Sequence, residues 1–184
     1  MLDAVTILQQ GGVVACPTEA VWGVSCAADN PQAIHKVLEL KQRPVEKGMI
    51  VATSTIEMLD GWVDWSHVPE DAKQRVMQTW PGPYTWVLPA TEAVLSEVTG
   101  ANSGKVAVRV TAHPELKALI DAFGKPILST SANLSGEPPV KLQQALSLAL
   151  LDNVDIVVPG EVGGLANPTA IRDALTGHVI RTSS

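Results

Sequence analysis

The chain has 184 residues, of which 46% are hydrophobic and 17% charged, a composition typical of a folded globular protein rather than a disordered one. The 13 basic and 19 acidic residues give a net charge of −6, which argues against a protein that coats nucleic acid through bulk positive charge. No apolar stretch reaches the roughly 18 residues of a membrane span, so we expect a single cytoplasmic domain over residues 1–184, with no membrane association.

Short apolar runs of strand length alternate along the chain with stretches of helical periodicity. Helices are expected over residues 1–10, 31–40, 69–80, 114–123 and 138–149, the last four with proline in the first turn. Strands are expected over residues 13–16, 49–52, 85–88, 106–110, 127–128 and 155–158, followed by a hairpin of 169–172 and 178–181. The alternation predicts an α/β fold, and the hairpin favours a mixed sheet over a purely parallel one.

The first candidate site residues, Thr18 and Glu19, come directly after the expected strand 13–16. Ligands of open α/β sheets bind where strands end, and Gly23 nearby permits a close approach to the backbone. A turn in which Thr18 and Glu19 are only capping residues, with Trp22 in the core, is the alternative interpretation.

A basic cluster follows, in which Lys41, Arg43 and Lys47 flank Pro44 in an expected loop. Because Lys41 and Arg43 are two residues apart, extended backbone geometry would point both side chains the same way, where they could clamp a triphosphate. A solvated basic loop is the alternative, since charge runs are commonly exposed.

Arg109 is the one charged residue in the apolar run 106–110. Burying an arginine is costly unless its guanidinium meets an anion or a carboxylate. The sequence leaves open whether that partner is a structural ion pair or the carboxylate of a substrate.

Segment 126–136 begins as an apolar strand and then changes to small polar residues, namely Ser129, Thr130, Ser131, Asn133, Ser135 and Gly136. Hydroxyl, amide and backbone N–H groups at a strand end suit a polyanion such as a nucleotide phosphate. A plain Ser/Asn turn would have the same composition.

Several familiar catalytic patterns are missing from the sequence. It has no phosphate-binding loop of the Gly-x4-Gly-Lys-Ser/Thr kind and no Gly-x-Ser-x-Gly elbow, and its histidines are too scattered to suggest a protein-held metal. Without a convincing nucleophile, the chemistry expected is one that aligns two bound substrates rather than one that forms a covalent enzyme intermediate.

The order of these motifs resembles the YrdC/TsaC family, most closely its short bacterial members, over about residues 3 to 182. The motifs that carry the resemblance are Pro17-Thr-Glu with Gly23, Lys41-Gln-Arg-Pro44, Trp80-Pro-Gly-Pro83 with Thr85, Ala107-Val-Arg-Val110, Ser129-Thr-Ser-Ala-Asn-Leu-Ser-Gly136 and Asn167-Pro-Thr-Ala-Ile-Arg-Asp173. The resemblance implies a twisted open α/β sheet flanked by helices, with a large concave ligand-binding face.

The family resemblance also implies an enzyme, an L-threonylcarbamoyladenylate synthase that uses L-threonine, bicarbonate, ATP and Mg²⁺. Threonylcarbamoyl-AMP would then pass to other proteins that modify tRNA, with at most a weak contact between this chain and RNA. By resemblance, threonine is bound by Thr18, Arg109, Thr130 and Thr169. The nucleotide is bound by Lys41 and Arg43, which are also the expected catalytic residues, and by Ser129, Ser131, Asn133 and Arg181.

The sequence departs from the commonest family pattern at Ala20, Trp22, Ser25 and Thr169, which affects the expected dimensions of the pocket rather than its charges. Two other functions remain as alternatives. One is a double-stranded-RNA-binding or ribosome maturation factor, which the net charge disfavours. The other is a carbamoyl-adenylate enzyme similar to the YrdC-like domain of hydrogenase-maturation proteins, which would use carbamoyl phosphate instead of threonine.

Overall fold

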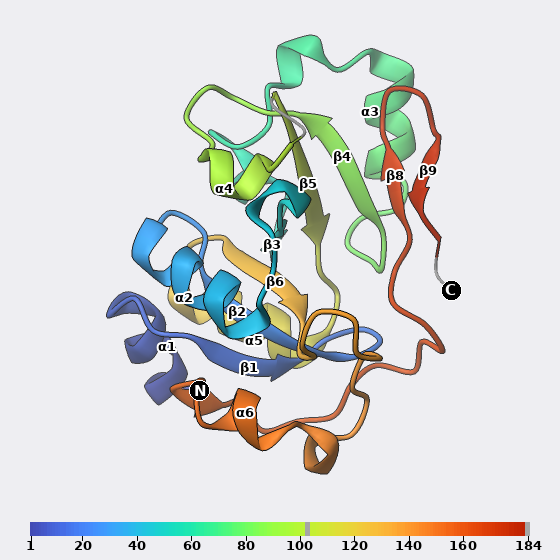
Figure 1. The fold of residues 1–184 in the computed structure, drawn as a ribbon. Helices are drawn as coiled ribbons and strands as arrows, with labels where there is room; N and C mark the ends of the chain where they lie inside the picture. The colour runs from blue at the N-terminus through green and yellow to red at the C-terminus, as the bar shows by residue number, and fades with distance from the viewer. Residues whose placement is uncertain (102–103, 183–184) are drawn as a thin grey trace.

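The computed structural model describes residues 1–101 and 104–182, in which helices and strands alternate as expected (Figure 1). The α-helices are α1 (Leu2–Gln9), α2 (Pro31–Lys41), α3 (Glu70–Met77), α4 (Ser96–Thr99), α5 (Pro114–Phe123) and α6 (Leu148–Leu151). The strands are β1 (Val14–Pro17), β2 (Trp22–Ala27), β3 (Ile50–Thr53), β4 (Thr85–Pro89), β5 (Lys105–Val110), β6 (Ile127–Ser131), β7 (Ile156–Val157), β8 (Ile171–Asp173) and β9 (Val179–Arg181). Short 3-10 helices are η1 (Val45–Lys47), η2 (Glu57–Leu59), η3 (Trp65–His67) and η4 (Gln143–Ala145).

The described strands form one nine-stranded sheet in the order β7-β1-β2-β6-β3-β5-β4-β8-β9. The pairs β1–β7, β3–β5 and β4–β8 are parallel and the other pairs antiparallel, so the prediction of a mixed sheet is confirmed. The expected C-terminal hairpin is also present, as β8 and β9 at one edge. No helix in the described part of the chain combines the length and hydrophobicity needed to cross a bilayer.

Local signals place the ends of helices α2 and α5. The side chain of Asn30 caps α2 by accepting a hydrogen bond from the Ala33 backbone N–H at 3.1 Å. The helix stops where Gln42 adopts a left-handed conformation, with φ of 48°. Proline at its first position starts α5, and Gly124 ends it in the same left-handed region, with φ of 75°.

Two expectations about secondary structure were wrong. Residues 22–27 form a strand, β2, where the sequence indicated only a turn and core positions. A continuous helix over 138–149 does not form. That stretch contains the short helices η4 and α6, and before them Val140 is held out of a helix because its carbonyl accepts a hydrogen bond from the Trp22 N–H at 2.7 Å.

Alternation along the strands divides the core between the two faces of the sheet. On one face, α2 packs on Trp22, Val24 and Val51 in the larger core. On the other face, α1 and α5 pack on β1, β7 and the start of β6 in a smaller core. The residues of β5 that point to this second face do not join the smaller core, and they line the pocket described next.

Candidate functional site

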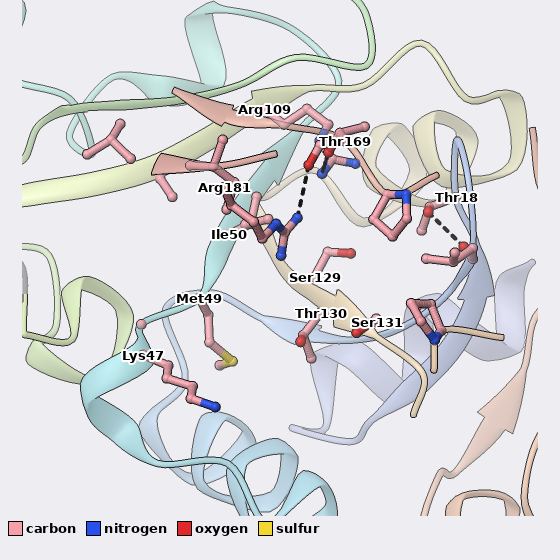
Figure 2. A pocket seen from close by; sticks show the side chains of 18 of the residues that line it. Thr18, Lys47, Met49, Ile50, Arg109, Ser129, Thr130, Ser131, Thr169 and Arg181 are labelled. Atoms are coloured by element: carbon pink, nitrogen blue, oxygen red, sulfur yellow. Dashed lines mark hydrogen bonds between the residues drawn. The ribbon is translucent and has the colours of Figure 1, made fainter. Parts of the chain in front are cut away.

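A pocket of about 310 Å³ lies on the part of the sheet that α1 and α5 leave uncovered (Figure 2). Strand β5 contributes Lys105, Ala107 and Arg109 to its wall, spaced two residues apart so that they share one face. Segments from the whole length of the chain complete the pocket, including Thr18, Gly23, Arg43, Lys47, Ser129, Thr130, Ser131, Thr169, Ile171 and Arg181. The structure therefore brings together most of the site residues expected from sequence.

Arg109 is held by three acceptors in the floor of this pocket. Its Nη1 donates to Glu19 Oε2 at 2.7 Å, its Nη2 to Thr169 Oγ1 at 2.7 Å, and its Nε to Thr85 Oγ1 at 3.0 Å. The side chains of Arg109 and Glu19 are only 10% and 8% exposed. The buried arginine is tolerated because the carboxylate of Glu19 is its counter-ion. Each Nη nitrogen carries a second N–H that none of these bonds uses, so the guanidinium can still receive a carboxylate.

Glu19 stays ionised in this buried position. Burial alone would raise the pKa of its carboxyl group, but the charge of Arg109 and the hydrogen bond from Thr111 outweigh that effect and lower the pKa below its ordinary value. The sequence marked Glu19 as a candidate site residue beside Thr18, with a capping residue of a turn as the alternative, but it was not linked to Arg109. The signal that could have linked the two is that each is a charge in an apolar context.

Thr18 and Gly23 shape one end of the pocket. The Thr18 hydroxyl donates to the carbonyl of Val21 at 2.7 Å, which fixes the turn between β1 and β2 (Figure 2). A Cβ atom at Gly23 would lie 3.0 Å from Thr18 Cγ2 and 3.4 Å from Ser129 Oγ. Glycine at this position therefore leaves more space between Thr18 and Ser129 than any other residue would.

The expected pair of parallel basic side chains does not form. The left-handed residue Gln42 turns the chain, so Lys41 and Arg43 are not in extended geometry and separate. The Lys41 ammonium is buried and donates to the carbonyls of Ser131 and Asn133, and Lys41 is not among the residues that line the pocket. Burial and the neighbouring Arg43 lower the pKa of Lys41 to about 8.

Arg43, Lys47 and Arg181 supply positive charge to the pocket itself. Figure 2 shows Lys47 and Arg181 among the residues that line it. Arg43 donates through Nε and Nη2 to the carbonyl of Gly48, at 3.2 and 2.9 Å, which fixes the loop after α2. Arg181 donates to the carbonyl of Thr169 at 3.0 Å. Burial lowers the pKa of Arg181, and the charges of Arg109 and Arg43 lower it further, as expected for guanidinium groups that share one cavity.

Asn133 does not reach the wall of the pocket. Its Nδ2 donates to the carbonyls of Leu134 and Glu137, at 2.9 and 2.7 Å, so the side chain folds back on its own turn. Two basic residues that the sequence analysis did not assign to a ligand, Lys47 and Lys105, do line the cavity. Lys105 is paired with Asp173 at 2.7 Å.

The pocket offers hydroxyl and cationic groups rather than a metal cage. Among residues 1–101 and 104–182, no cluster of three or more His, Cys, Asp or Glu side chains could hold a metal ion. Glu19, the acidic residue nearest to Arg109, has both carboxylate oxygens engaged by Arg109 and Thr111. These hydroxyl and cationic groups fit an anionic ligand.

The structure is that of a mixed α/β protein with a pocket on an uncovered sheet face, whose floor of arginine and hydroxyl groups suits a small anionic ligand. The chain belongs to the Sua5/YciO/YrdC family, whose model, described as "Telomere recombination", matches residues 6–183. A protein from Xanthomonas oryzae pv. oryzae named threonylcarbamoyl-AMP synthase is 51% identical over 97% of this chain and 95% of its own length. A protein of the same name from Stenotrophomonas maltophilia is 49% identical over 98% and 96%.

Solved structures of the family share the architecture. A double variant of P. abyssi Sua5 superposes with a TM-score of 0.91 at 28% identity, covering 99% of this chain and 56% of its own. P. abyssi Sua5 complexed with L-threonine gives a TM-score of 0.86 at 30% identity, covering 93% and 49%. This chain therefore spans about half the length of those Sua5 chains. E. coli YciO, at 23% identity and a TM-score of 0.81, shares the fold.

Proposed function

We propose that this protein is a threonylcarbamoyl-AMP synthase, which forms threonylcarbamoyl-AMP and pyrophosphate from L-threonine, bicarbonate and ATP. The observation that carries the proposal is Arg109, a guanidinium fixed by three acceptors in a pocket floor and left with unused N–H groups. The names of relatives about 50% identical to this chain over nearly its full length support the same activity, and none of them points to an RNA-binding factor.

The threonine end of the site is proposed to lie around Arg109. Its two spare N–H groups suit a bidentate bond to the amino-acid carboxylate. The hydroxyl-bearing residues Thr18 and Thr130 and the open space above Gly23 would surround the rest of the amino acid. P. abyssi Sua5, which shares the fold, has been solved with L-threonine bound.

The nucleotide end is proposed to use the cations that line the rest of the cavity. Arg43, Lys47 and Arg181 would neutralise the phosphates, and the hydroxyls of Ser129 and Ser131 would donate to phosphate oxygens. Lys41 and Asn133 would not touch the nucleotide but would support the residues that do. The Lys41 ammonium donates to the backbone carbonyls of Ser131 and Asn133 and so holds the turn that presents these hydroxyls. Mg²⁺ enters this proposal as part of the MgATP substrate.

The reaction needs no nucleophile from the protein. The threonine amine attacks the carbon derived from bicarbonate, which forms a carbamate and releases water. A carbamate oxygen then attacks the α-phosphorus of ATP, and the bond to the β-phosphate oxygen breaks to release pyrophosphate. The site contributes alignment of the two substrates and positive charge for the oxygens that gain charge in the transition state.

The product is proposed to be used by other proteins that complete the threonylcarbamoyladenosine modification of tRNA, in the cytoplasm. Cys16 and Cys26 are buried free thiols, and burial raises the pKa of the first to about 11 and of the second to about 12. Protonated, unpaired cysteines suit a reducing compartment. Any contact with RNA would be weak, because the net charge of the chain is −6.

A direct test is to supply ¹³C-bicarbonate together with L-threonine and MgATP and to analyse the products by mass spectrometry. The proposal expects threonylcarbamoyl-AMP that carries the label in its carbamoyl carbon. An adenylate without the label, or a labelled product formed equally well without threonine, would contradict it.

A further inference from the structure

Glu19 contacts Arg109, which lines the pocket, but does not line the pocket itself. Its Oε2 accepts from Arg109 Nη1 at 2.7 Å, and its Oε1 accepts from the Thr111 hydroxyl at 2.6 Å. The residue is 7% exposed and is not among those that line the pocket. Glu19 is therefore placed to act on a ligand through Arg109 and not by touching the ligand.

Two further contacts fix Glu19 in place: one holds its hydrogen-bond partner Thr111, and the other holds the backbone of the turn that carries Glu19. Thr111 is held in place because its Oγ1 also accepts the backbone N–H of His113 at 3.1 Å. The backbone of the turn is tied down as well, since the Thr18 carbonyl accepts the Gly163 N–H at 2.8 Å. A Cβ at Gly163 would lie 2.5 Å from the carbonyl oxygen of Glu19, so the two backbones are in close contact.

From this arrangement we infer that Glu19 is a positioning residue, which orients the Arg109 guanidinium so that its spare N–H groups meet the substrate carboxylate. The inference rests on the proposed function, in which that carboxylate belongs to threonine. An arginine side chain has many rotamers, and ordering it at the moment of binding would weaken affinity. Because Glu19 already holds the Arg109 side chain in one orientation in the free protein, this entropy cost is not paid on binding. The site is therefore selective for a ligand with a carboxylate.

The test compares L-threonine with L-threoninamide, which lacks only the carboxylate charge, by calorimetric binding to the wild type and to variants. We expect the wild type to prefer threonine by about tenfold or more, the usual worth of a charge-assisted pair. In Glu19→Ala the affinity for threonine should fall about tenfold, while that for threoninamide stays unchanged. Glu19→Gln, whose amide oxygen still accepts from Nη1, should keep most of the preference.

Two further variants separate positioning from general stability. Thr111→Val removes the hydrogen bond to Glu19 Oε1 and leaves the ion pair with Arg109. It should reduce the affinity for threonine by a few-fold without affecting the affinity for threoninamide. This variant also replaces Glu19→Ala as the test if Glu19→Ala does not fold. Asp155→Asn weakens another carboxylate contact, the 2.7 Å bond from the Val13 N–H to Asp155 Oδ2. That control should lower the melting temperature and leave the preference intact.

The outcomes distinguish this inference from the proposed function. Equal losses for both ligands in the folded Glu19 and Thr111 variants, or no loss for either, would overturn the positioning role. A wild type that shows no threonine-dependent pyrophosphate release would instead overturn the proposed function.

Discussion

At the scale of single residues, Arg109 explains why a charge is tolerated in an apolar strand. The sequence left two partners open, a structural carboxylate and a substrate carboxylate, and the pocket accommodates both on different N–H groups. Glu19 fills the first role at 2.7 Å, and the unused N–H groups remain for the second. The members of this pair are 90 positions apart, so the only signal in the sequence that could have linked them is that each is a charge in an apolar context.

The pair predicts an unusual result for a double variant. Arg109→Ala leaves the Glu19 carboxylate buried without its counter-ion, which should cost about 3–5 kcal/mol in the free energy of unfolding and abolish threonine-dependent turnover. Adding Glu19→Gln should recover most of that stability without restoring turnover. Urea denaturation and pyrophosphate release measured on the same samples test both parts. A double variant that regains activity would show that Arg109 is only structural.

Acid should destabilise the protein partly through Glu19. Its folded-state pKa is lowered below the ordinary value of 4.5, so the unfolded chain takes up the proton more readily. The stabilisation is full above that value and is lost as the pH falls through the folded pKa. We therefore expect the free energy of unfolding of Glu19→Gln to fall less steeply with acid than that of the wild type. Parallel curves would mean that folding does not lower the pKa of Glu19.

At the scale of elements, sequence periodicity found every helix of eight residues or more in the described part of the chain, and failed where tertiary contacts decide the outcome. Strand β2 was missed because all six of its residues are buried, which removes the alternation that marks a strand. The apolar spacing over 138–149 indicated a helix, but the backbone at Val140 pairs with Trp22 instead. Leu142, one of the residues with that spacing, is exposed.

The end of α2 is linked to the end of β6 through Lys41. Because its ammonium donates to the carbonyls of Ser131 and Asn133, we expect its charge to keep the turn in place. With a pKa of about 8, the ammonium loses its proton as the pH rises through that value, so kcat/KM for ATP should decline above it. In Lys41→Met, kcat/KM for ATP should be low at every pH and should not decline further above about pH 8. A wild-type profile that stays flat across this range would contradict the role.

Where β2 pairs with β6, the space between Thr18 and Ser129 depends on a residue without a side chain, Gly23. In Gly23→Ala the new Cβ would press on Thr18 and partly fill the space beside Ser129. The backbone there suits alanine, so we expect a folded protein whose KM for threonine rises several-fold. Gly164→Ala is the matched control, since a Cβ there meets no atom within 4 Å. Equal kinetics for both variants would place the threonine site elsewhere.

At the scale of the whole molecule, the site exists because helices cover one sheet face unequally. Helices α1 and α5 pack over β1, β7 and the start of β6. The pocket occupies the part of that face which they leave uncovered (Figure 2). Composition and periodicity predict a mixed sheet, but they do not say which part of it stays uncovered. The clustering of Arg43, Lys47, Arg109 and Arg181 in a chain of net charge −6 follows from that topology.

Pyrophosphate release from ATP and Mg²⁺, measured with threonine and bicarbonate omitted in turn, tests the central claim most directly. The proposed alignment of two substrates predicts release only when both are present, because the carbamate that attacks the α-phosphorus cannot form otherwise. Release that needs neither substrate, or no release under any condition, would contradict the account.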